Sequence, residues 1–218
     1  MIIVLSLLGI ILLGLVVGLA RRPKVQNAHR AYAQALRAMA GRTGWQIGRP
    51  PFAFPRLRDL NNAIGAGTRA DTTVTAQLSG QWQGVPVRVL QLYYWKDQVA
   101  VRSRLAATMI VLPRPVPGPN VTLTARGISW TNFMSGNRSI GHPAFDTRYH
   151  VHAGSVEEAR AVLTPAVAGQ LASDPRTQDR IFLFGEEVAA VFPGLLTQEA
   201  VTVATTDLLV DLVRRMAG

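Results

Sequence analysis

The residues of this chain whose types and spacing could do chemistry lie between Gly141 and His152. This segment holds three of the four histidines, His142, His150 and His152, together with Asp146. His150 and His152 are two residues apart, so on a strand both side chains would project from the same face. Imidazole and carboxylate groups are common ligands of zinc and other transition metals. A metal or catalytic site built on these four residues is therefore one hypothesis for the segment.

An ordinary surface strand explains the same spacing. In a strand from Phe145 to His152, the alternate residues would face the core and both histidines would face solvent. These inward residues are Phe145, Thr147, Tyr149 and Val151. Asp146 and Arg148 would then share one face and form a surface ion pair. The alternation of residues favours this structural role, so we assign no metal and no cofactor. A metal-binding or enzymatic site is the alternative.

The rest of the chain carries no recognisable catalytic motif. Gly65-Ala-Gly67 lacks the preceding strand and the further glycine of a phosphate-binding loop. Ser135 lacks the flanking glycines of a nucleophile elbow. The chain has no cysteine, which excludes disulfides and thiolate metal sites. We therefore expect a non-enzymatic protein.

Residues Ile2–Ala20 form an apolar segment in which Ser6 is the only polar side chain. As a helix, these 19 residues would be about 28 Å long, close to the thickness of the hydrocarbon core of a bilayer. A cleaved signal peptide would need a positive charge before the apolar run, and its best cleavage site, Gly18-Leu19-Ala20, runs straight into Arg21-Arg22. The segment predicts an uncleaved transmembrane anchor, with a cleaved signal as the alternative. No later segment is apolar over a comparable length, so we expect a single-pass protein.

Positive charge is concentrated beside this apolar segment. Residues 1–58 contain no Asp or Glu, and nine Arg or Lys lie within residues 21–58, whereas the remaining 160 residues hold 14 basic and 13 acidic side chains. Because Lys and Arg stay on the cytoplasmic side of a membrane, the N-terminus should lie outside and residues 21–218 in the cytoplasm. The balanced remainder argues against nucleic-acid binding. The residues expected to face anionic lipid headgroups are Arg21, Arg22, Lys24, Arg30 and Arg37.

A second helix is predicted after the anchor, with an apolar stripe that ends before Gly41. The stripe consists of Val25, Ala28, Tyr32, Leu36 and Met39. It could pack on the soluble domain or lie on the lipid surface, and its small alanines favour packing on the domain. Residues 48–58 carry three prolines and predict an extended linker. The chain therefore divides into an anchor (1–20), a basic juxtamembrane helix with a Pro-rich linker (21–58) and a soluble domain (59–218).

The soluble domain has the pattern of an α+β fold with an antiparallel sheet. Alternating apolar residues predict strands over Thr72–Gln83, Val85–Trp95, Ser103–Leu112, Val121–Arg126, Phe145–His152, Arg180–Phe184 and Val188–Phe192. A capping box over Ser155–Glu158 predicts one helix, and Thr164-Pro165 predicts the start of another. Thr197 should cap a final helix with a stripe of Val201, Thr205, Leu208, Leu212 and Met216. We expect two or three helices on one face of the sheet.

A set of turns and core positions runs through residues 65–213. It comprises Gly65-Ala-Gly67-Thr-Arg69, Gly80 and Gly84, Tyr93-Tyr94, Leu112-Pro113-Arg-Pro115, Gly141-His142-Pro-Ala-Phe145-Asp146, Leu163-Thr164-Pro165 and a closing leucine-rich helix. Together these features resemble a group of actinobacterial single-pass membrane proteins of unknown function. In that group a Phe-Asp pair often stands where this chain has Tyr93-Tyr94. The resemblance implies a tethered α+β domain and implies no activity.

The leading hypothesis is a membrane-anchored, non-enzymatic protein at the inner face of the membrane. Its α+β domain would bind a protein partner or the anionic lipid surface, and it would not bind nucleic acid. The alternative is a membrane-tethered enzyme or metal-binding domain that uses His142, Asp146, His150 and His152.

Overall fold

The computed structural model describes residues 27–49, 60, 72–98, 101–127 and 138–217. The predicted anchor Ile2–Ala20 lies outside these ranges, and so do Arg21, Arg22, Lys24 and most of the predicted linker over residues 48–58. Among the helices that are described, none is both long and apolar enough to cross a bilayer.

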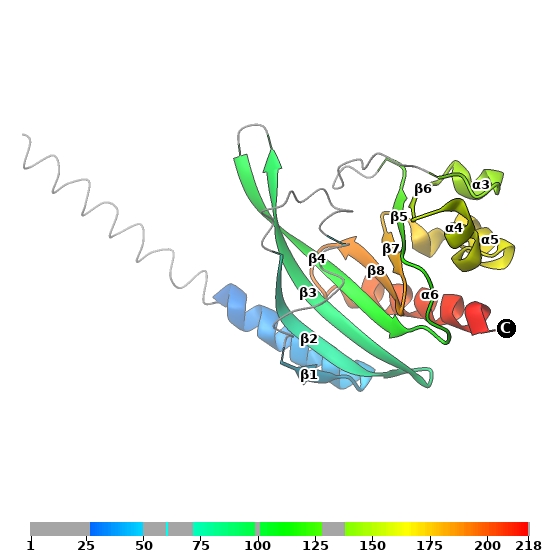
Figure 1. Ribbon diagram of the computed structural model, residues 1–218. Coiled ribbons are helices and arrows are strands. Elements are labelled where there is room, and N and C mark those ends of the chain that lie inside the picture. The colour runs from blue at the N-terminus through cyan, green and yellow to red at the C-terminus, as the bar shows by residue number, and fades with distance from the viewer. Residues whose placement is uncertain (1–26, 50–59, 61–71, 99–100, 128–137, 218) are drawn as a thin grey trace, which may run out of the picture.

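An antiparallel sheet of eight strands forms the centre of the described structure (Figure 1). In spatial order the strands are β1 (Gln46–Gly48), β2 (Thr73–Trp82), β3 (Val85–Gln98), β4 (Val101–Pro113), β8 (Glu187–Pro193), β7 (Ile181–Phe184), β5 (Val121–Ala125) and β6 (Tyr149–His152). The predicted β2–β3 hairpin is confirmed: Gln83 and Gly84 turn the chain with φ of 51° and 81°, as a tight two-residue turn requires. Six of the seven predicted strands are confirmed within a few residues, whereas β1 was not predicted.

Helices cover one face of this sheet. They are the helix over residues 27–43, α3 (Pro143–Asp146), α4 (Val156–Val162), α5 (Pro165–Ser173), the 3-10 helix η1 (Pro175–Thr177) and α6 (Glu199–Ala217). Apolar side chains from the helix over residues 27–43 and from α3, α4, α5 and α6 join those of the strands in one large core. The α+β class is therefore confirmed, and the three helices predicted in the soluble domain correspond to α4, α5 and α6.

The opposite face of the sheet carries a second, smaller core. Its buried members come from alternate positions of the central strands: Leu90, Leu92, Tyr94, Ala107, Met109, Val111, Ile181, Leu183, Ala189 and Val191, with Leu60 packed among them. The sheet is therefore buried on both faces at its centre. This explains why β7 and most of β8 consist of continuous apolar residues.

The helix over residues 27–43 packs its apolar stripe on the sheet, as the sequence favours. Leu36 and Met39 are buried in the main core and Tyr32 is half-buried, whereas Ala28 is exposed. Trp45 follows the helix and lies against Gly80 of β2, where a Cβ atom would come within 2.6 Å of the Trp45 ring. The helix and Trp45 therefore share the core of the domain that the sequence pattern begins at residue 59, and β1 extends its sheet by pairing with β2.

The predicted strand Phe145–His152 is wrong in its first half. Pro143 to Asp146 form the short helix α3, and the strand begins only at Tyr149. The cause is local: His142 caps the helix, and Pro143 occupies its first position, where the missing N–H costs nothing. The solvent-facing placement of His150 is also wrong. His150 is only 6% exposed, although its neighbours Tyr149 and Val151 take the positions that join the main core.

Two of the predicted helix caps are confirmed. The Ser155 hydroxyl accepts from the Glu158 N–H at 3.0 Å, and the Thr164 hydroxyl accepts from the Val167 N–H at 3.5 Å. Thr197 is not the cap of the last helix, because α6 starts at Glu199 and its first turn closes from the Thr202 N–H to the Gln198 carbonyl. The stripe of α6 is buried at Thr205, Leu208 and Leu212, but Met216 is only partly buried and Val201 is 36% exposed.

A fully buried glutamine joins three parts of the fold. The Gln91 amide nitrogen, on β3, donates to the Ala107 carbonyl of β4 at 2.9 Å. Its amide oxygen accepts from the Leu196 N–H at 2.9 Å, in the loop between β8 and α6, and from the Tyr32 hydroxyl at 3.5 Å. The burial of Tyr32 raises its pKa to about 12, so the hydroxyl keeps its proton. Gln91 thus links the sheet, the loop before α6 and the helix over residues 27–43.

We expect Gln91→Leu to lower the free energy of unfolding by about 2–3 kcal/mol, because it leaves the buried Leu196 N–H and Ala107 carbonyl short of a partner. Thermal or urea unfolding of the full chain in detergent micelles measures this change. The matched control is Gln81→Leu at an exposed position of β2, which should stay within about 0.5 kcal/mol. Equal effects of the two substitutions would contradict the role assigned to Gln91.

Candidate functional site

The Asp146 carboxylate accepts hydrogen bonds from the turn that precedes it in the chain. It accepts from the Ser139 hydroxyl at 2.7 Å and from three backbone N–H groups, those of Ile140, Gly141 and His142, at 3.0, 3.0 and 3.1 Å. Burial raises the pKa of Asp146, but these hydrogen bonds outweigh burial, and the net pKa lies below its ordinary value. The carboxylate therefore stays charged and holds the segment 139–142 in place.

The three histidines of the segment have separate positions. The His142 Nδ1 accepts from the Phe145 N–H at 3.3 Å and caps α3. His150 and His152 lie on β6, where they pair in register with Thr124 and Thr122 of β5. Burial lowers the pKa of both, and for His150 the nearby Arg126 and His152 lower it further. Both imidazoles are therefore neutral at pH 7.

The four candidate residues do not form a ligand set. No group of three or more His, Asp or Glu side chains with the spacing of a metal site occurs within the part of the chain that the structure describes. The expected ion pair between Asp146 and Arg148 is not formed either. The Arg148 guanidinium instead donates to the Ala172 carbonyl at the end of α5, and Asp146 binds the turn described above.

The outer face of the helix over residues 27–43 is basic. Arg30 and Arg37, both expected to face lipid headgroups, are exposed and lie seven residues apart, which places them on one face of the helix. Gln34 lies between them on the same side and is also exposed. Leu36 and Met39, on the opposite side, are buried in the core. The helix therefore joins the core along one face and presents two arginines along the other.

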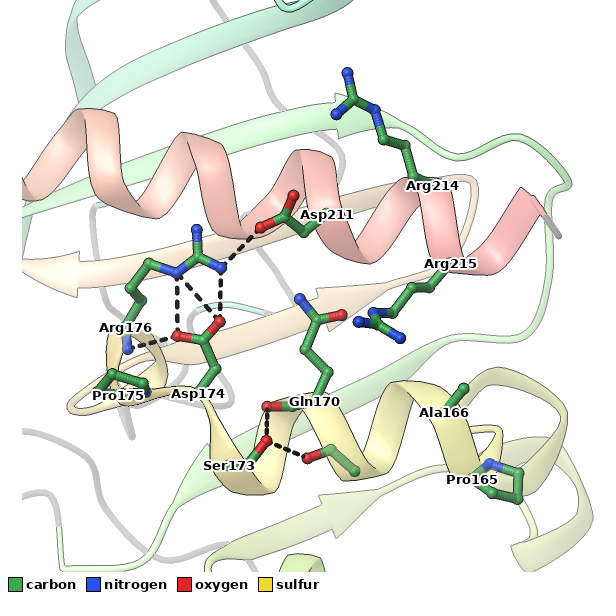
Figure 2. A pocket seen from close by; sticks show the side chains of 11 residues that line it. Pro165, Ala166, Gln170, Ser173, Asp174, Pro175, Arg176, Asp211, Arg214 and Arg215 are labelled. Atoms are coloured by element: carbon green, nitrogen blue, oxygen red, sulfur yellow. Dashed lines mark hydrogen bonds and ion pairs between the residues drawn. The ribbon is translucent and has the colours of Figure 1, made fainter.

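A groove that the sequence did not reveal lies between α5 and the C-terminal half of α6 (Figure 2). Its volume is about 1070 Å³. On the α5 side it is lined by small side chains, including Ala166, Gly169 and Ser173, and on the α6 side by Asp211, Arg214 and Arg215. The small residues of α5 leave the space that longer side chains would fill.

Arg176 closes one end of this groove by joining two carboxylates. Its guanidinium donates to Asp174 at 2.6 to 3.1 Å and to Asp211 at 2.7 Å, so it ties the end of α5 to α6. These hydrogen bonds hold the pKa of Asp174 below its ordinary value and raise the pKa of Arg176. Both acidic groups of the groove are thus already paired with a cation.

The other polar side chains of the groove form fewer hydrogen bonds within the described structure than Arg176 does. Arg214 donates to the side chain and the carbonyl of Gln83 at 2.9 and 3.2 Å. Arg215 is exposed, and Figure 2 shows its side chain directed toward Gln170. The Gln170 Oε1 is buried and has no hydrogen-bond donor among the described residues. The groove therefore offers an available guanidinium and a buried acceptor close to each other.

Part of this site could have been read from the sequence. Ala166, Gly169 and Ser173 recur at helical spacing after the predicted cap at Thr164, and Arg214-Arg215 stands in the last turn of the predicted final helix. What the sequence did not reveal is that the two helices lie side by side. Their approach depends on the sheet order, which places β8 and β7 between β4 and β5.

We expect Asp146→Asn to lower the free energy of unfolding by about 1–2 kcal/mol at pH 7, because an amide accepts fewer of the four hydrogen bonds. The pKa of Asp146 is depressed in the folded state, so the carboxylate stabilises the fold above its ordinary pKa of 3.8 and stops doing so as the pH falls through the folded-state value. The difference between wild type and variant should therefore shrink below pH 3.8.

Urea unfolding at several pH values measures this dependence, and Glu186→Gln at an exposed position is the matched control, with an expected change within about 0.5 kcal/mol. An Asp146→Asn variant with unchanged stability and lost cellular function would contradict the structural role and favour a chemical one.

Comparison with known proteins shows a shared fold and no sequence family. No protein-family model and no curated protein matches the chain. The crystal structure of the mycobacterial trehalose monomycolate transport factor A is similar, with a TM-score of 0.52 and 18% sequence identity, over 85% of this chain and 92% of that chain. At this identity the likeness concerns the fold alone. It agrees with the α+β fold that the actinobacterial resemblance implies.

Proposed function

We propose that this chain is a membrane-tethered, non-enzymatic factor that assists the transport of a long-chain glycolipid by binding a protein partner. The observation that carries the proposal is the fold shared with a trehalose monomycolate transport factor, because the likeness spans nearly all of both chains. A factor of this kind needs a position at the membrane and a surface for a partner, and it needs no reactive group of its own.

The N-terminal part of the chain supports the position at the membrane. Residues Ile2–Ala20 are apolar, and the acid-free segment 21–58 holds nine positive charges. Anchored by this segment, the domain would lie at the inner face of the membrane with the N-terminus outside. Arg30 and Arg37 would then contact anionic headgroups, where each contributes about 1 kcal/mol to binding at the surface. Arg21, Arg22 and Lys24 would join them from residues beyond the described part.

The structural roles of the polar residues favour a binding function over a catalytic one. Asp146, His142 and Arg148 are engaged with backbone groups that shape the segment around α3. His150 is only 6% exposed, so little of its side chain is open to a substrate. The groove between α5 and α6, in contrast, is open and lined by polar side chains that a second protein can contact.

Depletion of the protein in its native cells tests the proposal. Labelling with radioactive acetate should show unchanged total glycolipid, because synthesis does not need the protein, while the share exposed at the cell surface falls several-fold. Wild-type protein should restore this share, and a variant without residues 2–20 should not. Loss of total glycolipid would instead indicate an enzyme of synthesis, and an unchanged surface share would contradict a role in transport.

A further inference from the structure

We propose that the groove between α5 and α6 binds an acidic peptide segment of a protein partner, with Arg215 and Gln170 as its recognition residues. This inference rests on the proposed function, because it assigns the partner-binding surface and the chemistry of the partner.

The groove has the dimensions of a peptide site. The nine residues of α5 give the groove a wall about 14 Å long, which matches about four residues of extended chain. The small side chains of Ala166 and Ser173 keep this wall low, so a main chain can approach α5 closely. A volume of about 1070 Å³, open along one side, suits a segment that lies along the groove (Figure 2).

The charge of the groove favours an acidic occupant. Three arginines and two aspartates line it, and both aspartates are already bound to Arg176. Arg215 has no hydrogen bond or ion pair with the residues that the structure describes, and it is exposed at the rim. An incoming Asp or Glu side chain can therefore bind the Arg215 guanidinium in a bidentate pair without competing with an internal carboxylate.

A buried acceptor distinguishes this groove from a simple basic patch. The Gln170 Oε1 is hidden from solvent and lacks a donor among the described residues, which costs free energy in the unbound protein. When the Gln170 side chain turns into the groove, a backbone N–H of a bound peptide satisfies this oxygen. A fully ionised inorganic anion such as sulfate has no donor to offer, so the pair of Gln170 and Arg215 matches a peptide that carries both an amide and a carboxylate.

The position of the groove points away from the membrane. The helix over residues 27–43, which is the first described element after the predicted anchor in the sequence, begins at one end of the described structure, and α5 lies with the C-terminal end of α6 at the other end (Figure 1). A surface at the far end from the anchor faces the surrounding solution and not the headgroups of the anchoring bilayer. The occupant is therefore a protein segment.

Selection from a library of random decapeptides displayed on phage, against the full chain in detergent micelles, tests the proposal. We expect the enriched peptides to contain two or more Asp or Glu residues and to lose affinity at least tenfold, on the order of 1.4 kcal/mol, against Arg215→Glu. Gln170→Leu and the groove-filling Ala166→Trp should weaken the same peptides without a change in charge. Arg49→Glu, an exposed charge reversal after β1, is the matched control and should bind them as wild type does.

Three results would overturn the proposal. The first is a set of enriched peptides without acidic residues, or with equal affinity for Arg215→Glu. The second is binding of inorganic phosphate alone that Arg215→Glu abolishes, which would show a simple anion site. The third is Arg215-dependent binding of protein-free vesicles that contain anionic lipid. Failure of the peptide selection in a protein that still restores glycolipid transport would refute the groove assignment and leave the proposed function standing.

Discussion

The buried amide of Gln91 is the contact on which the arrangement of this domain depends. It is fully buried on β3, and its hydrogen bonds reach β4, the loop before α6 and the helix over residues 27–43. An amide buried in an apolar core is tolerated only when its donors and acceptors are satisfied, so these elements have to meet in one relative position. The position of α6 then determines the groove, because Arg176 ties the end of α5 to Asp211.

The fold separates two surfaces that suit different partners. At one end, the helix over residues 27–43 contributes Leu36 and Met39 to the core and presents Arg30 and Arg37 outward. At the other end, α5 and α6 enclose the groove with Arg215 at its rim. A domain of this shape can be held at a lipid surface while its far end binds another protein.

The sequence predicted most of the fold because its patterns are local. Alternation in β2 and β3, the Ser155 and Thr164 caps and the stripe around Leu36 each depend on neighbouring residues. The errors arose where distant contacts decide the structure. His150 is buried although local alternation places it on the face opposite the core residues Tyr149 and Val151, and β1 exists because Gln46–Gly48 pairs with β2. The groove joins segments that only the sheet order brings together.

The central claim is that one end of the domain lies at the membrane and the groove end does not. Because the chain has no cysteine, Gln34→Cys and Ser173→Cys each provide a single labelling position in the full chain. With a fluorophore at either position in anionic vesicles, nitroxide-labelled headgroups should quench the probe at position 34 strongly and the probe at position 173 little. Arg30→Glu combined with Arg37→Glu should reduce the quenching at position 34. Equal quenching at both positions, or stronger quenching at position 173, would contradict the account.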